Sequence, residues 1–183
     1  MKICFTGHRP NKLGGYDINS QKNLMVAKEL INVLSNIITE SEDEEFHFIC
    51  GGAIGFDQIA FHVCNYISKK SNKFKDKKFT TEIAVPFEKQ YIKWNRNDVD
   101  FYLNQLNQAD KITYVDKLEN YNKTTANQGD YHPYKMQLRN MYMVDNSDVL
   151  IACWDGSKGG TYNCVEYASS LKKRIIRLKN IFD

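Results

Sequence analysis

Residues 46–57 read Phe46-His47-Phe48-Ile49-Cys50-Gly51-Gly52-Ala53-Ile54-Gly55-Phe56-Asp57, and this stretch decides the fold. A short apolar run predicts a buried strand, and the glycines after it let the backbone turn sharply and approach a ligand closely. The unpaired N–H groups of a helix that starts here would point toward that ligand. The stretch therefore predicts an anion site at the end of a strand, with Asp57 available to a ribose hydroxyl or an amine.

A second stretch of the same kind lies about a hundred residues further on. The apolar run 149–154 leads into Asp155-Gly156-Ser157-Lys158-Gly159-Gly160-Thr161. Adjacent glycines at a helix start form a nest of backbone donors, and the Thr161 hydroxyl adds one more. Lys158 either reaches a phosphate or remains a solvated charge. Two such turns in one chain suggest a nucleotide held between strand ends.

The composition is that of an ordinary globular protein. The chain has 183 residues, with 42% hydrophobic and 26% charged residues, so we expect a single domain over 1–183. The net charge is only +3, which gives little support to nucleic acid as a partner. One local basic cluster is either a solvated loop or a landing site for nucleic acid: Lys69, Lys70, Lys73, Lys75, Lys77 and Lys78.

The cysteines and apolar runs bear on location and cofactors. Five cysteines without C-x-x-C spacing, three of them in strand-like runs, suit buried thiols in a reducing cytoplasm. We expect no metal site and no evident cofactor, although Mg²⁺ can accompany a nucleotide. No run approaches the roughly 20 apolar residues of a membrane span, so we expect no membrane partner.

Strand-like and helix-like segments alternate along the chain. This order predicts an α/β fold: a Rossmann-like, doubly wound, mainly parallel sheet with helices on both faces. A polar segment over 116–131 is long for a loop in a compact domain. The expected strands are 2–6, 46–50, 79–85, 111–115, 148–154 and 174–178, and the expected helices are 20–39, 56–68, 88–108, 133–145 and 160–172.

In this architecture ligands bind beyond the carboxyl ends of the strands. Gly7, the Gly51-Gly52 pair, Pro86 and Asp155-Gly156 all follow strands, so we expect them on one edge of the sheet. His8 and Arg9 come directly after the first strand. Arginine offers a planar fork for phosphate and histidine can bond to or stack on a base. The alternatives are a surface ion pair for Arg9 and a turn cap for His8.

These segments resemble the SLOG superfamily, specifically its YpsA-like branch. The resemblance implies a Rossmann-like domain that binds nucleotides or nucleotide-derived ligands, and its distant relatives include the Lonely Guy phosphoribohydrolases and the DNA-uptake protein DprA. Lone SLOG domains commonly pair, so it also implies a homo-oligomer. The matching pieces are Thr6-Gly7-His8-Arg9-Pro10, the 51–57 turn, Pro86-Phe87 with Gln90 and Trp94, Arg139-Asn140, Met143-Val144-Asp145, Ser147-Asp148 and Trp154-Asp155-Gly156 through Gly159-Gly160-Thr161.

The resemblance to Lonely Guy enzymes raises the question of catalysis. Those enzymes cleave the N-glycosidic bond of nucleoside monophosphates with an arginine and with a glutamate after their glycine turn. Arg139 looks like the counterpart of the arginine, but the position of the glutamate holds Cys164, and Glu166 lies two residues further along the helix. Two residues rotate a helical side chain by about 200°. The candidate catalytic residues are Arg139, Glu166 and Asp57, while Arg139 could also clamp a ligand or pair with Asp145 or Asp148.

We therefore expect a binding protein for a nucleotide or nucleotide-derived molecule, ADP-ribose-like signals included, that serves sensing or sequestration without turnover. An N-glycosidic hydrolase of nucleotides is the first alternative, and DprA-like binding of single-stranded DNA is the second. The expected ligand-binding residues are Gly7, His8, Arg9, Gly51, Gly52, Ala53, Gly55, Asp57, Pro86, Arg139, Asp155, Gly156, Lys158, Gly159, Gly160 and Thr161.

Overall fold

A computed structural model describes residues 1–179 and 181–182. Its centre is one sheet of six strands in the order β4-β3-β2-β1-β5-β6, and every neighbouring pair is parallel. The predicted Rossmann-like parallel sheet is thus confirmed. The strands are β1 (Lys2–Gly7), β2 (Glu45–Cys50), β3 (Lys78–Val85), β4 (Lys111–Tyr114), β5 (Val149–Cys153) and β6 (Arg174–Arg177).

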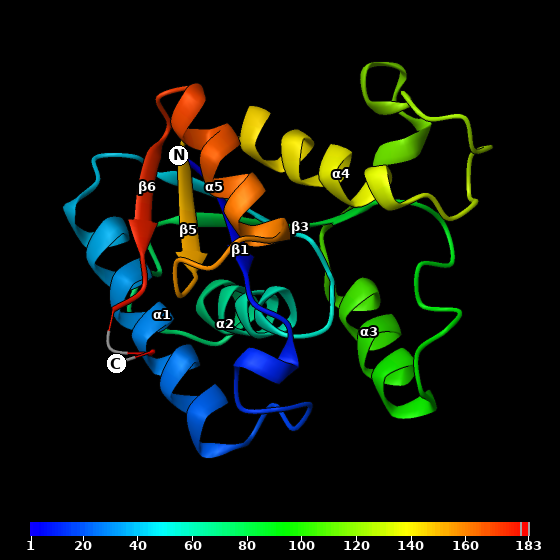
Figure 1. The fold of residues 1–183 in the computed structure, drawn as a ribbon. Helices are drawn as coiled ribbons and strands as arrows, with labels where there is room; N and C mark the ends of the chain where they lie inside the picture. Colours follow the sequence, from blue (N-terminus) through cyan, green and yellow to red (C-terminus); the bar gives the residue numbers. More distant parts are fainter. Residues whose placement is uncertain (180, 183) are drawn as a thin grey trace.

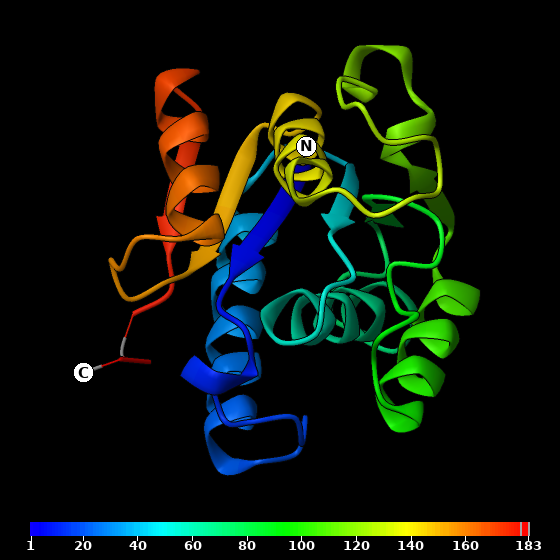
Figure 2. The same cartoon turned by 45° about the vertical axis from the view of Figure 1, so that its right-hand side comes forward.

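Helices cover both faces of this sheet (Figures 1 and 2). One face carries three helices, of which α2 packs against its two neighbours, and the other carries two helices that pack on each other. The core is divided accordingly into two apolar clusters, one on each side of the strands. The first layer is α1 (Gln21–Glu40), α2 (Phe56–Lys69) and α3 (Arg96–Gln108), and the second is α4 (Pro133–Asp145) and α5 (Gly160–Ser170).

The chain order places a switch point between β1 and β5. The first four strands add in sequence away from β1, and the chain then returns through α4 to add β5 on the free side of β1. The register pairs Gly7 with Cys153 at the carboxyl ends of these two strands. The connections diverge to opposite faces here, so the two strand ends leave a crevice where a ligand fits.

The helix predicted over 88–108 is wrong in its first part. The chain turns through residues 87–94, and α3 begins only after Asn95. The Asn95 side chain accepts a hydrogen bond from the Asp98 amide at 3.0 Å and thereby caps the helix. The apparent helical spacing of Tyr91 and Trp94 has another cause, because both rings pack against buried Tyr102.

The long polar segment after β4 is held by a buried ion pair. It contains two short 3-10 turns, Val115–Lys117 and Glu119–Tyr121, and no longer helix. Lys135, on α4, donates to the Asp116 carboxylate at 2.9 Å, and both side chains are almost fully buried. The same ammonium group donates to the carbonyl oxygens of Asn127 and Asp130, so a single lysine fixes the loop from inside.

The basic cluster lies away from the carboxyl ends of the strands. Residues 69–78 connect the end of α2 to the start of β3, which is the opposite edge of the sheet. Part of the cluster serves local structure: Lys77 donates to the Asp43 carbonyl at 2.8 Å and Lys78 pairs with Glu45. All five cysteines are free and buried. Within the described residues, no helix has both the length and the apolar character that a membrane crossing requires.

Candidate functional site: a cationic cavity at the switch point

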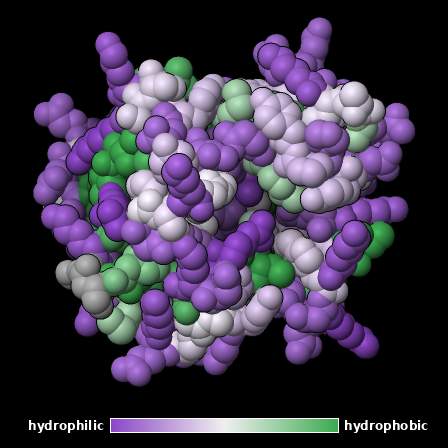
Figure 3. Space-filling view, viewed as in Figure 1, coloured by the Kyte–Doolittle hydropathy of each residue, from purple (hydrophilic) through white to green (hydrophobic). Residues whose placement is uncertain are grey.

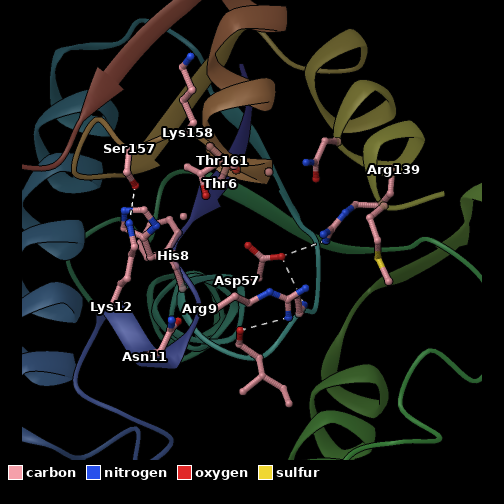
Figure 4. A pocket seen from close by; sticks show the side chains of 18 residues that line it. Thr6, His8, Arg9, Asn11, Lys12, Asp57, Arg139, Ser157, Lys158 and Thr161 are labelled. Atoms are coloured by element: carbon pink, nitrogen blue, oxygen red, sulfur yellow. Dashed lines mark hydrogen bonds and ion pairs between the residues drawn. The ribbon is translucent and has the colours of Figure 1, made fainter. Parts of the chain in front are cut away.

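A cavity of about 250 Å³ opens where the sequence predicts the ligand site, beyond the carboxyl ends of β1 and β5. The hollow lies near the middle of the molecular face in Figure 3, and Figure 4 shows its lining. Residues that follow β1, β2 and β5 form three sides, and α4 forms the fourth. The lining residues are Thr6, Gly7, His8, Arg9, Asn11, Lys12, Ala53, Ile54, Phe56, Asp57, Met136, Arg139, Asn140, Ser157, Lys158, Gly159, Gly160 and Thr161.

A buried ion pair forms the inner wall. Arg139 donates from Nη1 to Oδ2 of Asp57 at 2.9 Å, and only 6% and 8% of the two side chains are exposed. The partner is thus neither Asp145 nor Asp148, which bond to other groups. The pair passes directly over Gly51, where an added Cβ atom would lie 1.4 Å from Nη1. Gly51 is therefore needed for the close approach of a side chain, and not only for a turn.

The wall carries unused hydrogen-bonding capacity and excess positive charge. Among the described residues, buried Nε of Arg139 has no hydrogen-bond partner. Arg9 runs beside the pair, and its guanidinium contacts the Ile54 carbonyl at 3.5 Å (Figure 4). Among the residues that the structure describes, one carboxylate, Asp57, lines the cavity together with four Lys or Arg side chains: Arg9, Lys12, Arg139 and Lys158. A cavity of this charge favours an anion.

The start of α5 adds backbone donors to the opposite wall. Gly159 is the N-cap at φ 151°, and no side chain of residues 1–179 or 181–182 donates or accepts a capping hydrogen bond there. An added Cβ atom at Gly159 or Gly160 would meet nothing within 4 Å, so this turn is open. Unpaired amides at a helix start and the positive end of the helix dipole attract phosphate. Lys158 and Thr161 line the cavity on the same side.

Asp155 organises the neighbouring side chains instead of lining the cavity. Its carboxylate receives hydrogen bonds from Ser157 and Lys12, and these bonds lower its pKa. His8 Nε2 lies 2.8 Å from Oδ1 of the same carboxylate. Burial lowers the pKa of His8, although Asp155 opposes this effect. This carboxylate thereby orients a lysine and a serine at the rim, and the Asp155 amide donates a hydrogen bond to Nε2 of the largely buried His8 at 3.0 Å.

The structure brings most of the predicted binding residues together. Gly7, His8, Arg9, Ala53, Asp57, Arg139, Lys158, Gly159, Gly160 and Thr161 line the cavity. Gly51 lies beneath the ion pair, Gly52 packs against Tyr102, and Gly55 contacts the backbone of His8 and Arg9. Pro86, Asp155 and Gly156 are outside the lining.

Several lining residues carry no sequence signal of their own. Thr6 and Asn140 belong to the quoted family motifs, whereas Asn11, Lys12 and Met136 belong to an ordinary loop and helix. Only the tertiary fold brings these residues to the strand ends. Ser157 stands inside the second predicted glycine turn, and Ile54 and Phe56 stand inside the first, so proximity to the motifs would have identified these three.

The structure separates the catalytic candidates. Glu166 is exposed on α5 and does not line the cavity. Cys164, at the position of the expected glutamate, is fully buried. Burial raises the pKa of the Cys164 thiol to about 12, so it stays protonated at neutral pH. Asp57 is the one carboxylate that reaches the cavity among the described residues, and Arg139 already neutralises it.

The six-stranded parallel sheet and the cationic cavity at its switch point define a Rossmann-like α/β domain. Comparison with known families agrees: residues 3–175 match the model of the YspA SLOG family. The chain belongs to this family.

Two relatives extend the match. The chain is 37% identical over 145 residues to the SPbeta prophage-derived protein YoqJ of Bacillus subtilis (strain 168), which covers 79% of this chain and 81% of YoqJ. It is 24% identical over 180 residues to a UPF0398 protein of Bacillus cereus (strain ATCC 14579), over 98% of this chain and 88% of the relative.

A solved structure shares the fold. DNA processing protein A from Helicobacter pylori, whose single-stranded DNA binding mode has been described, superposes with a TM-score of 0.55 and 15% identity. The superposition covers 97% of this chain and 64% of that protein. The likeness concerns the Rossmann-like architecture, since the present chain spans less than two thirds of the DNA-processing protein.

Proposed function

We propose that this protein binds a nucleotide or a nucleotide-derived molecule in the switch-point cavity, and that binding serves sensing or sequestration without turnover. One observation carries the proposal: the open start of α5 faces the Arg139–Asp57 pair across a cavity with four cationic side chains. Backbone donors with lysine and arginine recognise phosphate. ADP-ribose-like molecules belong to the expected class because they carry phosphates between two ribose groups.

The carboxylates in and near the cavity favour binding without turnover. Hydrolysis of an N-glycosidic bond requires a group that stabilises positive charge on the ribose or activates water. Asp57 is bound to Arg139 and to the Ala53 amide, and Glu166 lies outside the cavity. A neutral thiol at Cys164 does not supply a carboxylate. Binding without chemistry is therefore the function that this lining supports best.

Isothermal titration with AMP, ADP, ATP and ADP-ribose tests the proposal. We expect at least one of these ligands to bind, and Lys158→Ala to weaken it by about fivefold, because a cation beside a phosphate contributes roughly 1 kcal/mol. Lys123→Ala is the matched control, since Lys123 is also exposed but lies in the loop after β4. A flat response to all four ligands contradicts the proposal.

The same samples test both alternatives. Chromatography after long incubation should show intact nucleotide, and release of free base that is lost in Asp57→Asn would indicate a hydrolase instead. Fluorescence anisotropy with a single-stranded oligonucleotide tests the activity described for the Helicobacter pylori protein. Tight oligonucleotide binding with a steep salt dependence, and no binding of mononucleotides, would favour DNA as the ligand.

A further inference from the structure

A second cavity, of about 200 Å³, lies beside the cationic one. The loop over residues 10–18, the first turns of α2 and the start of α3 form its walls. Ile54 lines both cavities, so the two share a wall. Arg9 contacts the carbonyl of this same residue at 3.5 Å. The two cavities therefore lie on either side of Ile54, close enough for two parts of one ligand.

The two cavities have opposite charge. Asp17 and Asp98 line the second cavity, and among the described residues no lysine, arginine or histidine lines it. A phosphate would be repelled there, whereas the first cavity attracts it. Carboxylates accept hydrogen bonds, so the second cavity suits an uncharged group with N–H or O–H donors.

The walls of the second cavity also suit a flat ring. Tyr16 and Phe101 supply aromatic surface, and Ile54 and Ile59 supply aliphatic surface. Tyr16 is 69% exposed, and nothing described covers it. Asn23 holds the backbone that presents this tyrosine, because its side chain bonds to Gly14, Gly15 and Asp17. Aromatic rings on such a platform stack on nucleobases.

A buried amide in this wall is incompletely bonded. Gln58 lines the second cavity with only 6% of its surface exposed, and its Nε2 has no hydrogen-bond partner among the described residues. A buried donor without a partner is unfavourable, and structures normally satisfy it. A glutamine side chain offers one donor edge and one acceptor edge, which is the pattern that the edge of an amino-bearing base complements.

We propose that the second cavity binds the nucleobase of the ligand, and that this base carries an exocyclic amine, as adenine does. The amine donates to the acceptors of the acidic wall, Gln58 pairs with the ring edge, and Tyr16 stacks on the ring face. The phosphates lie in the first cavity, and Arg9 stands between the two parts. This assignment rests on the proposed function, and it adds the class of base and the residues that select it.

Titration with ADP, inosine diphosphate and ribose 5-phosphate tests the assignment. Inosine diphosphate differs from ADP by a carbonyl oxygen in place of the amine and by a proton on ring atom N1, and ribose 5-phosphate carries no base. We expect ADP to bind at least tenfold tighter than inosine diphosphate. In Gln58→Met, which keeps the shape of the side chain without its amide, that ratio should fall below threefold, while the affinity for ribose 5-phosphate stays unchanged.

Tyr16→Ala provides a second variant that does not disturb the core, because Tyr16 is exposed. It should weaken ADP at least fivefold and leave ribose 5-phosphate unaffected. Tyr66→Ala is the matched control, since Tyr66 is an exposed tyrosine on α2 that lines neither cavity. Equal affinities for ADP and inosine diphosphate, or variants that weaken all three ligands alike, overturn the base assignment. Failure of every ligand to bind overturns the proposed function itself.

Discussion

The guanidinium of Arg139 and the carboxylate of Asp57 join two helices that cover opposite faces of the sheet. Arg139 belongs to α4 and Asp57 to the first turn of α2, and their charged groups meet at 2.9 Å above the end of β2. The ion pair therefore forms the inner wall of the cavity, and it fixes the relative position of the two helix layers at this edge.

Removal of either partner should destabilise the protein markedly. Asp57→Ala leaves the Arg139 charge buried and unpaired, which costs about 3–5 kcal/mol of unfolding free energy. The double variant with Arg139→Met should cost less than the sum of the two single variants, because the stranded charge is then absent. Urea denaturation measures this coupling. Glu88→Ala is the control: its pair with Lys117 is exposed at 3.5 Å and contributes at most about 1 kcal/mol. Additive effects at Arg139 and Asp57 would contradict the buried pair.

Gly51→Ala should damage the same site by a steric route. The new methyl group would collide with Arg139 Nη1 and lie 2.4 Å from Asp57 Oδ2, so the pair must move or break. We expect a loss of about 3 kcal/mol in unfolding free energy, together with weaker nucleotide binding.

Gly160→Ala is the matched control for stability. An added Cβ atom there meets nothing within 4 Å, and the residue is not among those with positive φ. It should therefore fold like the parent protein. A wild-type unfolding curve for Gly51→Ala would show that the Arg139 side chain does not occupy this position.

The buried carboxylate of Glu82 predicts a specific pH dependence of stability. Burial alone would raise its pKa, but hydrogen bonds from His47, Tyr142, Thr113 and Lys111 outweigh this and lower the pKa to about 2. A depressed folded-state pKa stabilises the protein above the unfolded value near 4.5. This contribution, about 3 kcal/mol, should disappear as the pH falls from about 5 to about 2.

Glu82→Gln isolates that contribution. Its unfolding free energy should change less than that of the parent protein between pH 5 and pH 2, in denaturant titrations at each pH. Glu42→Gln serves as control, because Glu42 is exposed and no hydrogen bond to its carboxylate is present among the described residues. Parallel pH profiles for Glu82→Gln and the parent protein would contradict a depressed pKa. The residue also matters for the site, because Tyr142 donates to Glu82 from the turn of α4 that follows Arg139.

The Lys135–Asp116 pair should control the order of the loop before α4. Lys135→Met removes the only charge that the buried Asp116 carboxylate pairs with among the described residues, together with two bonds to loop carbonyls. Hydrogen exchange at the Gly129 amide, which donates to Asp116 at 2.7 Å, should then accelerate at least tenfold. Lys123→Met replaces an exposed lysine of the same loop and should leave this rate unchanged. An unaltered rate in Lys135→Met would assign the order of the loop to other contacts.

Local sequence patterns predicted most of the fold. The helix predicted over 20–39 is α1, and in the structure the Ser20 side chain caps it by accepting a hydrogen bond from the Asn23 amide. The helix 133–145 matches α4 at both ends. The helix predicted over 88–108 was wrong for residues 88–94, because the helical spacing of Tyr91 and Trp94 is a coincidence. Both rings pack on Tyr102, which lies further along the chain in α3, and Asn95 caps the start of that helix between them.

The sequence by itself determined the alternation of strands and helices, and with it the edge of the sheet where the glycine turns meet. Apolar periodicity and turn residues are local properties, so they are readable in one dimension. The tertiary structure alone decided the partners of the buried charged groups: Arg139 with Asp57, and Lys135 with Asp116. Such pairing depends on which distant side chains share a low-dielectric site, and the spacing of residues along a chain does not encode that distance.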